Sequence, residues 1–395
     1  MNFAFTAEEE AFRAEVREFI AGAMTDEIPS RWLGGLLDTP ARQEFVTKMA
    51  DKGWLSIGFP EEYGGTESTM PLAQYVLNEE LHMAQAPIVG KNLGVVVNTL
   101  LHQGSEELKQ EFVPRILRNE IQWALAYTEP EAGSDLANMQ CRAVLDGDEY
   151  VINGTKRFIT SAHFADYMWT GVRTDPDAPK HKGISLLILD MDSPGITITP
   201  IWTIIGERTN DVFLDNVRVP KERLVGEENK GWQYITEALT YERFAMTSIA
   251  PTVRKFQRFV DFVKKTEVDG KRLADDPVVR RKIARLSVLV EIGRMLDFRC
   301  VAMAVKPDYV PYIEAAMNKM WGGIVETKMS DQFLDILGPY GYLWKDSEAN
   351  PSEDALLDGD VADDYLWAGH LRVAAAGVDI SKNIIARRHL NLPSS

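Results

Sequence analysis

A single carboxylate stands in an apolar stretch of the sequence, "ALTYERFAM", which runs from Ala238 to Met246. On a helix, the neighbours of Glu242 are the residues three, four and seven positions away. None of these neighbours is basic; they are Ile235, Ala238, Leu239, Ala245, Met246 and Ile249. A charged carboxylate among apolar side chains is poorly solvated, so we expect the pKa of Glu242 to be raised and the group to act as a base. The alternative is that Glu242 pairs with an arginine from another helix and only satisfies a buried charge.

A second stretch, "AYTEPEAGSDLAN", offers groups that suit an anion or the edge of a ring. Gly133 and Ser134 present backbone N–H groups and a hydroxyl without bulky neighbours, and Asp135 can cap the residues that follow. This combination suits a phosphate or a flavin edge. Gly-Ser-Asp also describes many ordinary turns, so the residues alone leave both interpretations open.

Several other chemistries lack their motifs. The six histidines include no pair at i, i+4 and no cysteine at zinc-ligand spacing, so no metal site is predicted. The glycines of a dinucleotide-binding turn or a P-loop are missing, and so is a G-x-S-x-G nucleophile elbow.

The composition indicates a soluble globular chain. Its 395 residues are 45% apolar with a formal net charge of −16, which argues against a nucleic-acid or anionic membrane surface. Cys141 and Cys300 make no disulfide framework, and the amino terminus is acidic where a signal or transit peptide would be basic. No uncharged apolar run approaches the roughly 18 residues of a membrane span. We therefore expect a cytoplasmic protein.

The hydrophobic period changes twice and predicts three domains. A capping box at Thr6 and Glu9 and helical segments over about 71–84 and 108–117 predict an α domain over 1–122. Strand-like runs with a hairpin at Asn153-Gly154 predict a β domain over 123–228. Long helical segments predict an α domain over 229–395; they cover about 232–265, 277–305, 311–337 and 364–388.

The segment between Trp344 and Asp364 is rich in Asp and Glu, with Lys345 as its single base. A charge run of this kind is usually a solvated loop. A docking surface or a lid is the alternative.

With these motifs in this order, the sequence resembles the acyl-CoA dehydrogenase family over nearly its whole length. The resemblance rests on "AYTEPEAGSD", "INGTKRFITSAHFADYMWTGVRT", "KGISLLILDMDSPGITITPI", "FLDNVRVPKERLVGEENKGW", "YERF", "ILGPYGY" and "NIIARRHLNLP". It implies an α+β multidomain fold with an N-terminal helical bundle, a central β-barrel or sandwich and a C-terminal four-helix bundle.

The resemblance also implies an activity. A flavoprotein of this family uses FAD to convert an acyl-CoA thioester to a trans-2-enoyl-CoA and passes the electrons to an electron-transfer flavoprotein. The segments "AYTEPEAGSDLAN", "ADYMWTGVRT" and "YERF" look closest to the branch that acts on bulky or branched acyl chains, including steroid side chains. The alternatives are an acyl-CoA oxidase-like flavoenzyme and a non-catalytic partner subunit.

The resemblance implies five residues that contact the cofactor. The alternative for each is an ordinary structural role in the β core or in a turn. By similarity, Thr128 hydrogen-bonds the flavin ring, Gly133 and Ser134 lie along the FAD and the thioester arm, Phe158 stacks on the isoalloxazine, and Thr160 meets the flavin near N5.

The family carries its catalytic Glu at one of two places, and the resemblance locates both. The later place falls on Ala375, within "RVAAAGVDISK", where the side chain cannot act as a base. The earlier place falls on Glu242, so by similarity Glu242 removes the α-proton and Arg243 helps to hold the CoA thioester arm. The backbone N–H of Ala375 still serves as a donor to the thioester oxygen.

Two departures from the family pattern concern the flavin. The segment "AAGVDIS" lacks the Thr and Ser that the family uses for flavin contact. Thr266 and Asp269 occupy the places of an Arg-x-x-Phe segment that in many relatives reaches the FAD of the neighbouring subunit, and Arg272 is a conceivable substitute. Family members with the same loss work as mixed tetramers, so a homotetramer and a heterotetramer with a related chain both stay open.

Overall fold

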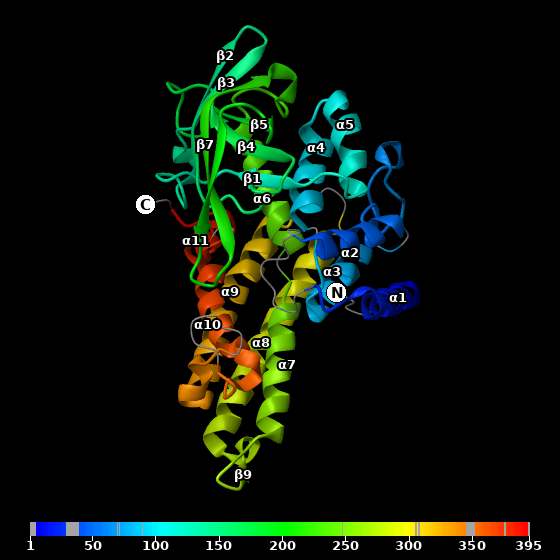
Figure 1. Ribbon diagram of the computed structural model, residues 1–395, viewed down its shortest axis with the longest axis vertical. Coiled ribbons are helices and arrows are strands. Elements are labelled where there is room, and N and C mark those ends of the chain that lie inside the picture. The colour runs from blue at the N-terminus through cyan, green and yellow to red at the C-terminus, as the bar shows by residue number, and fades with distance from the viewer. Residues whose placement is uncertain are drawn as a thin grey trace. The chain divides into compact units, whose positions relative to one another are not determined.

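The computed structural model describes residues 5–28, 39–68, 70, 72–88, 90–246, 248–304, 306, 309–344, 352–374 and 377–393. The chain divides into two compact units, of which one is Phe5–Met246 and the other is made largely of Thr247–Ser395. Figure 1 labels the helices and strands of both units.

The first unit begins with helices. They are α1 (Ala7–Ala23), α2 (Pro40–Asp51), α3 (Ala73–Ala84), the π-helix η2 (Asn92–Val97), α4 (Asn98–Gln103) and α5 (Glu106–Leu117). The predicted capping box is confirmed, because the Thr6 hydroxyl accepts a hydrogen bond from the Glu9 N–H and the Glu9 carboxylate accepts one from the Thr6 N–H. The helices predicted over about 71–84 and 108–117 correspond to α3 and α5.

A seven-stranded sheet follows in the same unit. Its strands are β1 (Trp123–Ala126), β2 (Arg142–Asp146), β3 (Glu149–Lys156), β4 (Tyr167–Arg173), β5 (Ile184–Asp190), β6 (Ile196–Trp202) and β7 (Arg208–Pro220). The strand order is β1-β4-β2-β3-β7-β6, with β5 paired to β4. Strands β1 and β2 run parallel to β4, and the remaining pairs are antiparallel.

The hairpin predicted at Asn153-Gly154 is wrong. The turn lies earlier, at Gly147 and Asp148, and Gly147 has the positive φ of 66° that a type II′ turn needs at its first central residue. Asn153 and Gly154 lie inside β3, where the pairing with β7 shifts between Ile152 and Gly154. An Asn-Gly pair suits a β-bulge as well as a turn, because both need a residue outside the ordinary strand conformation.

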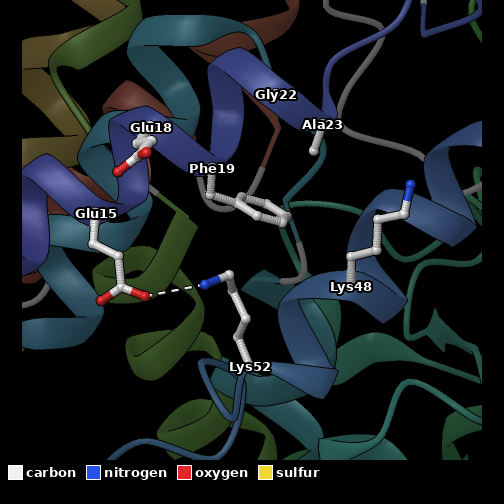
Figure 2. Close-up of a pocket in the computed structure, with 7 residues that line it drawn as sticks. All are labelled: Glu15, Glu18, Phe19, Gly22, Ala23, Lys48 and Lys52. Atoms are coloured by element: carbon white, nitrogen blue, oxygen red, sulfur yellow. Dashed lines mark hydrogen bonds and ion pairs between the residues drawn. The ribbon is translucent and has the colours of Figure 1, made fainter.

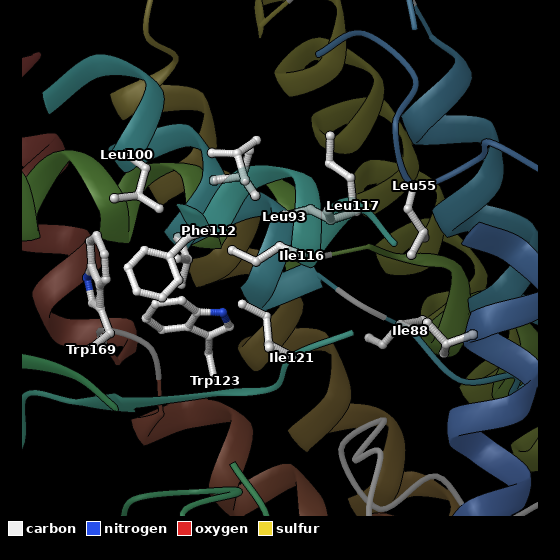
Figure 3. Close-up of a cluster of buried hydrophobic side chains, with 14 of the residues drawn as sticks. Leu55, Ile88, Leu93, Leu100, Phe112, Ile116, Leu117, Ile121, Trp123 and Trp169 are labelled. Atoms are coloured by element: carbon white, nitrogen blue, oxygen red, sulfur yellow. The ribbon is translucent and has the colours of Figure 1, made fainter. Parts of the chain in front are cut away.

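The sheet shares its two faces between two hydrophobic cores. Trp123, Trp169 and Ile188 pack with Phe112 and other helix residues in one core, and Figure 3 shows Phe112 between the two tryptophans. The alternate residues of the same strands, such as Ala124 and Leu187, belong to a second core within the sheet domain. Because side chains alternate between the two faces along each strand, the helices pack on one face of the sheet.

Helix α6 (Gly231–Met246), which carries Glu242, closes this unit and packs against η2, α4 and β5. Its Ile235 is fully buried, and a Cβ added at Gly171 would lie 3.0 Å from Ile235 Cδ1. Gly171 thus allows a close approach of the helix to β4.

The second unit consists of α7 (Ala250–Lys265), the short strands β8 (Glu267–Val268) and β9 (Lys271–Arg272), α8 (Pro277–Ala304), α9 (Tyr312–Leu337), α10 (Asp360–Val373) and α11 (Val378–Arg388). The long helices run alongside one another (Figure 1). Phe259 and Phe333 stack in the core with ring centroids 3.6 Å apart. Among the described residues, none of the helices combines the length and the apolarity that crossing a bilayer requires.

Two predicted helices are each divided in the structure. The segment 232–265 forms α6 and α7, because Pro251 lies in the first turn of α7 and Ser248 accepts a hydrogen bond from the Ala250 N–H. The segment 364–388 forms parts of α10 and α11, with Gly377 as the N-cap of α11. The segments predicted over 277–305 and 311–337 correspond to α8 and α9.

The acidic segment is structured at its carboxyl-terminal end, while residues 345–351 lie outside the described part of the chain. Arg258 pairs with Asp358 and Asp360. Lys255 lies 2.9 Å from Asp364 and 3.0 Å from Glu326. The prediction of a solvated loop is therefore wrong for Asp360 and Asp364, which belong to α10 and its ion pairs, whereas Glu353 and Asp354 are exposed.

Candidate flavin site

A strained turn follows β3 and contains two of the predicted flavin residues. Phe158 has φ 59° and Ser161 has φ 73°, and neither is glycine. Such conformations cost about 1–3 kcal/mol each and persist where the surroundings impose them, often at functional sites. The Phe158 ring is 57% exposed although it is apolar, while Thr160 is half-buried.

Backbone and amide hydrogen bonds hold this turn from two sides. The N–H of Ile159 donates to Asn210 O at 2.8 Å, and Asn210 Nδ2 donates to Ile159 O at 2.9 Å. The N–H of Arg157 donates to Thr128 O at 2.8 Å. The predicted residue Thr128 is thereby brought beside the turn that bears Phe158 and Thr160.

The loop that contains Thr128 is anchored by a buried ion pair. Lys156 is fully buried in β3, and its Nζ lies 2.7 Å from Glu129 Oε1 and donates to Tyr127 O at 3.3 Å. Glu129 in turn accepts hydrogen bonds from the N–H groups of Gln140 at 2.5 Å and Cys141 at 3.0 Å. One carboxylate therefore ties both ends of the loop to the same strand.

Arg173, at the end of β4, holds the far part of this loop. Its guanidinium donates to the backbone oxygens of Ala137 at 2.7 Å and Met139 at 3.2 Å. Desolvation by burial lowers the pKa of Arg173. The Arg173 guanidinium therefore holds the loop by hydrogen bonds to backbone carbonyls.

Between these anchors, the tip of the loop is open. Gly133 and Ser134 are exposed, and a Cβ added at Gly133 would meet nothing within 4 Å. Asp135 pairs with Lys180 and does not cap the 3₁₀ turn that follows. A fixed loop with an open tip, beside an exposed aromatic ring, fits the edge and face of a flavin.

A lysine that immediately precedes η2 reaches the strained turn. Lys91 Nζ donates to Ser161 Oγ at 2.5 Å. Desolvation lowers the pKa of Lys91 to about 7. π-helical turns such as η2 are frequent at functional sites.

The remaining predicted residues are less completely described. Glu242 and Arg243 lie in the last turns of α6, but the side chains of residues 241–247 are outside the described part of the structure. The raised pKa of Glu242 therefore stays a prediction. Ala375 also lies outside the described residues.

The structure thus joins Thr128, Phe158 and Thr160 and places Gly133 and Ser134 on the same anchored loop. The sequence interpretation missed the residues that position them; these are Lys91, Glu129, Lys156, Ser161 and Arg173. One signal was present, because Lys156 interrupts a strand pattern in "INGTKRFIT" and Glu129 is the acid nearest to the predicted flavin residue Thr128.

A separate surface pocket lies on α1 and α2 and shares no residue with this site. Figure 2 shows Glu15 and Lys52 pointing toward one another across it, 3.1 Å apart, with Phe19 behind them. Both charged side chains are well exposed to water. Over the described ranges, no group of three or more His, Cys, Asp or Glu side chains is arranged to hold a metal ion.

Comparison with known families gives one consistent match along the chain. Models of the acyl-CoA dehydrogenase N-terminal, middle and C-terminal domains match residues 6–120, 124–217 and 229–390. Acyl-CoA dehydrogenase FadE26 of Mycobacterium tuberculosis is 32% identical over 402 residues, spanning 100% of this chain and 99% of the relative.

Two similar solved structures name pairs of chains. The ChsE4-ChsE5 complex from Mycobacterium tuberculosis has a TM-score of 0.89 at 31% identity, with 100% of both chains covered. The Tcur3481-Tcur3483 steroid ACAD has a TM-score of 0.89 at 33% identity, again with 100% of both chains covered. These matches confirm the predicted fold class: a helical amino-terminal part, a central sheet domain and carboxyl-terminal helices.

Proposed function

Because the chain belongs to the acyl-CoA dehydrogenase family, we propose that it is an FAD enzyme in which Glu242 removes the α-proton of an acyl-CoA thioester. By family membership, the chain is a flavoprotein oxidoreductase that acts on the CH–CH bond of an acyl-CoA. The observation that carries the proposal of a bound flavin is the exposed Phe158, held in a strained turn beside the Thr128 loop. We retain the domain limits 1–122, 123–228 and 229–395 as part of this proposal.

The reaction is the loss of two hydrogens from adjacent carbons. Glu242 takes the α-hydrogen as a proton, and the electron pair of that C–H bond becomes the Cα–Cβ double bond of a trans-2-enoyl-CoA. The β-hydrogen leaves with its electron pair, and bound FAD supplies the acceptor for it. A base with a raised pKa is matched to a weakly acidic α-proton. The Ala375 N–H stabilises negative charge on the thioester oxygen, and Arg243 holds the thioester arm.

The residues that the structure describes offer the surface, the space and the hydrogen-bond donors that a flavin requires. Phe158 offers an exposed ring face, and Gly133 leaves room where a side chain would intrude. Thr128, Thr160 and Ser134 would supply hydroxyl donors, and Ser134 lies where the thioester arm would pass.

The acyl group and the electron acceptor belong to the same proposal. The similarity to the Tcur3481-Tcur3483 steroid ACAD supports a bulky or branched acyl group as the substrate of this chain. We propose an electron-transfer flavoprotein as the acceptor of the electrons, as is usual for dehydrogenases of this family. We also place the protein in the cytoplasm, where its two free cysteines, Cys141 and Cys300, would stay reduced.

We favour an assembly with a second, related chain. Arg272, the substitute considered for the missing Arg-x-x-Phe arginine, already donates to Asp275, three residues further along the chain, at 2.9 Å and 3.1 Å. Both similar structures named above carry the names of two chains. The measurement is the ratio of flavin to protein in this chain purified alone: a colourless or substoichiometric protein supports a heterotetramer, and one flavin per chain refutes it in favour of a homotetramer.

The base is tested by Glu242→Gln. We expect the variant to retain flavin while the rate of flavin bleaching by acyl-CoA falls by about 10²–10⁴, the usual contribution of a positioned base. The matched control is Glu237→Gln on the same helix, where the carboxylate accepts from Gln103 Nε2 at 3.3 Å and has no assigned role. Wild-type bleaching by Glu242→Gln would refute the assignment.

A further inference from the structure

The bond from Lys91 to Ser161 joins two parts of the first unit that are far apart in the sequence. Lys91 immediately precedes the π-helix η2, and Ser161 follows Thr160 in the strained turn. The acceptor Ser161 is fully buried, and Lys91 is half-buried, with desolvation lowering the pKa of its ammonium. In the part of the chain that the structure describes, no carboxylate forms an ion pair with Lys91. A partly buried amine that forms no ion pair is costly and marks a candidate functional position.

The strained turn requires such a tie. Phe158 and Ser161 both have positive φ, so the turn carries two unfavourable backbone conformations three residues apart. Asn210 holds the Phe158 end through Ile159. The Ser161 end is fixed by its carbonyl, which accepts from the N–H groups of Phe164 at 3.1 Å and Ala165 at 3.0 Å, and by the Lys91 bond to its side chain. Lys91 thus ties this turn to the helical part of the unit.

We propose that Lys91 is a positioning residue for the flavin, because its bond to Ser161 fixes the turn from which Phe158 and Thr160 meet the ring. This inference rests on the proposed function for the placement of the flavin, and it adds a residue that acts through Ser161. Lys91 immediately precedes the π-helix against which α6 packs. A movement of Lys91 relative to Ser161 would therefore move the flavin-contacting turn relative to the π-helix against which α6 packs.

The experiment compares Lys91→Met, Lys91→Arg and Ser161→Ala in the flavin-loaded assembly, with the partner chain present if this chain alone holds no flavin. The readouts are the dissociation constant of FAD for the apoprotein and the visible absorption band of bound flavin. We expect Lys91→Met and Ser161→Ala each to weaken FAD binding at least tenfold and to shift the band, and Lys91→Arg to restore most of both. The double variant should lose little more than either single one, since both remove the same bond.

Lys52→Met serves as the control, because Lys52 belongs to the same unit and pairs with Glu15 at the surface. Wild-type FAD affinity and an unchanged band in folded Lys91→Met would overturn the proposal. If Lys91→Met does not fold, Ser161→Ala decides by the same criteria, because it removes a single buried oxygen. The proposed reaction is scored separately, by bleaching of wild-type flavin with acyl-CoA. If acyl-CoA bleaches the wild-type flavin but the Lys91 variants bind FAD like the wild type, the positioning role of Lys91 is refuted and the proposed reaction stands. If acyl-CoA does not bleach the wild-type flavin, the proposed reaction is refuted, and the FAD affinity of the variants still tests the role of Lys91.

Discussion

The ammonium of Lys156 lies 2.7 Å from Glu129 Oε1, in an interior where the Lys156 side chain has no exposed surface. The pair connects β3, which leads into the strained turn, with the loop that carries Thr128, Gly133 and Ser134. Breaking a buried pair by removing one partner leaves an uncompensated charge. This ion pair is therefore the part of the candidate site on which both stability and flavin binding depend.

Lys156→Met should destabilise the protein by about 3–5 kcal/mol, because the Glu129 carboxylate stays buried without its cation. FAD affinity should fall as well, since the loop loses its tie to β3. The measurement is denaturant unfolding of the variant together with a flavin titration.

Lys156→Met combined with Glu129→Gln is the control for this prediction. Removing both charges should recover a large part of the lost stability, because no unpaired charge remains in the interior. A single variant as stable as the wild type would show that the carboxylate is relieved by some other group, and the anchoring role would have to be abandoned.

Phe158→Gly should change stability and flavin binding in opposite directions. Glycine adopts the φ of 59° without strain, so the free energy of unfolding of the apoprotein should rise by about 1 kcal/mol. FAD affinity should fall because the exposed ring is lost. Ile204→Ala, at another exposed apolar residue (80% exposed), should leave FAD affinity unchanged. A Phe158→Gly protein that binds FAD like the wild type would show that the ring does not meet the flavin.

Much of the fold could be predicted from periodicity, because α8 and α9 bury a stripe at helical spacing and the strands alternate between two cores. The Thr6–Glu9 capping box was also readable, since both partners are local. The break between α6 and α7 was missed because Pro251 is tolerated inside the first helical turn, where it does not interrupt the apolar pattern.

The site was less readable than the fold. Thr128, Phe158 and Thr160 came from family motifs, and the structure brings them together through backbone bonds that no side-chain pattern encodes. Lys91 and Ser161 are 70 positions apart, so a contact between them depends on the packing of the helices on the sheet. The Glu129–Lys156 pair likewise joins a loop to a distant strand, β3, and a lone lysine in a strand reads first as a surface residue.

Gly154→Ala should destabilise the sheet by about 1–3 kcal/mol. Gly154 has φ 153°, and an added Cβ would lie 2.8 Å from Cys141 Cα, which is backbone and cannot move aside cheaply. Gly147→Ala is the matched control, because Gly147 also has positive φ but an added Cβ meets nothing within 4 Å. Denaturant unfolding should show the larger loss at Gly154. Equal losses would mean that the β-bulge in β3 relaxes around the methyl group.

The lowered pKa of Lys91 predicts a contribution to stability that rises with pH, whereas proteins usually become less stable in alkali. Burial lowers its pKa from 10.5 to about 7, so between these values the unfolded chain binds a proton that the native protein releases. The unfolding free energy should therefore rise with pH across this window, with a contribution that approaches about 1.4 kcal/mol per pH unit. Lys91→Met should lose this contribution, so the wild-type minus variant difference, measured by denaturant unfolding from pH 6.5 to about 9.5, isolates it from other titrating groups. A difference that is flat over that range would mean that Lys91 keeps its proton in the native protein, and the enclosure of its ammonium would have to be abandoned.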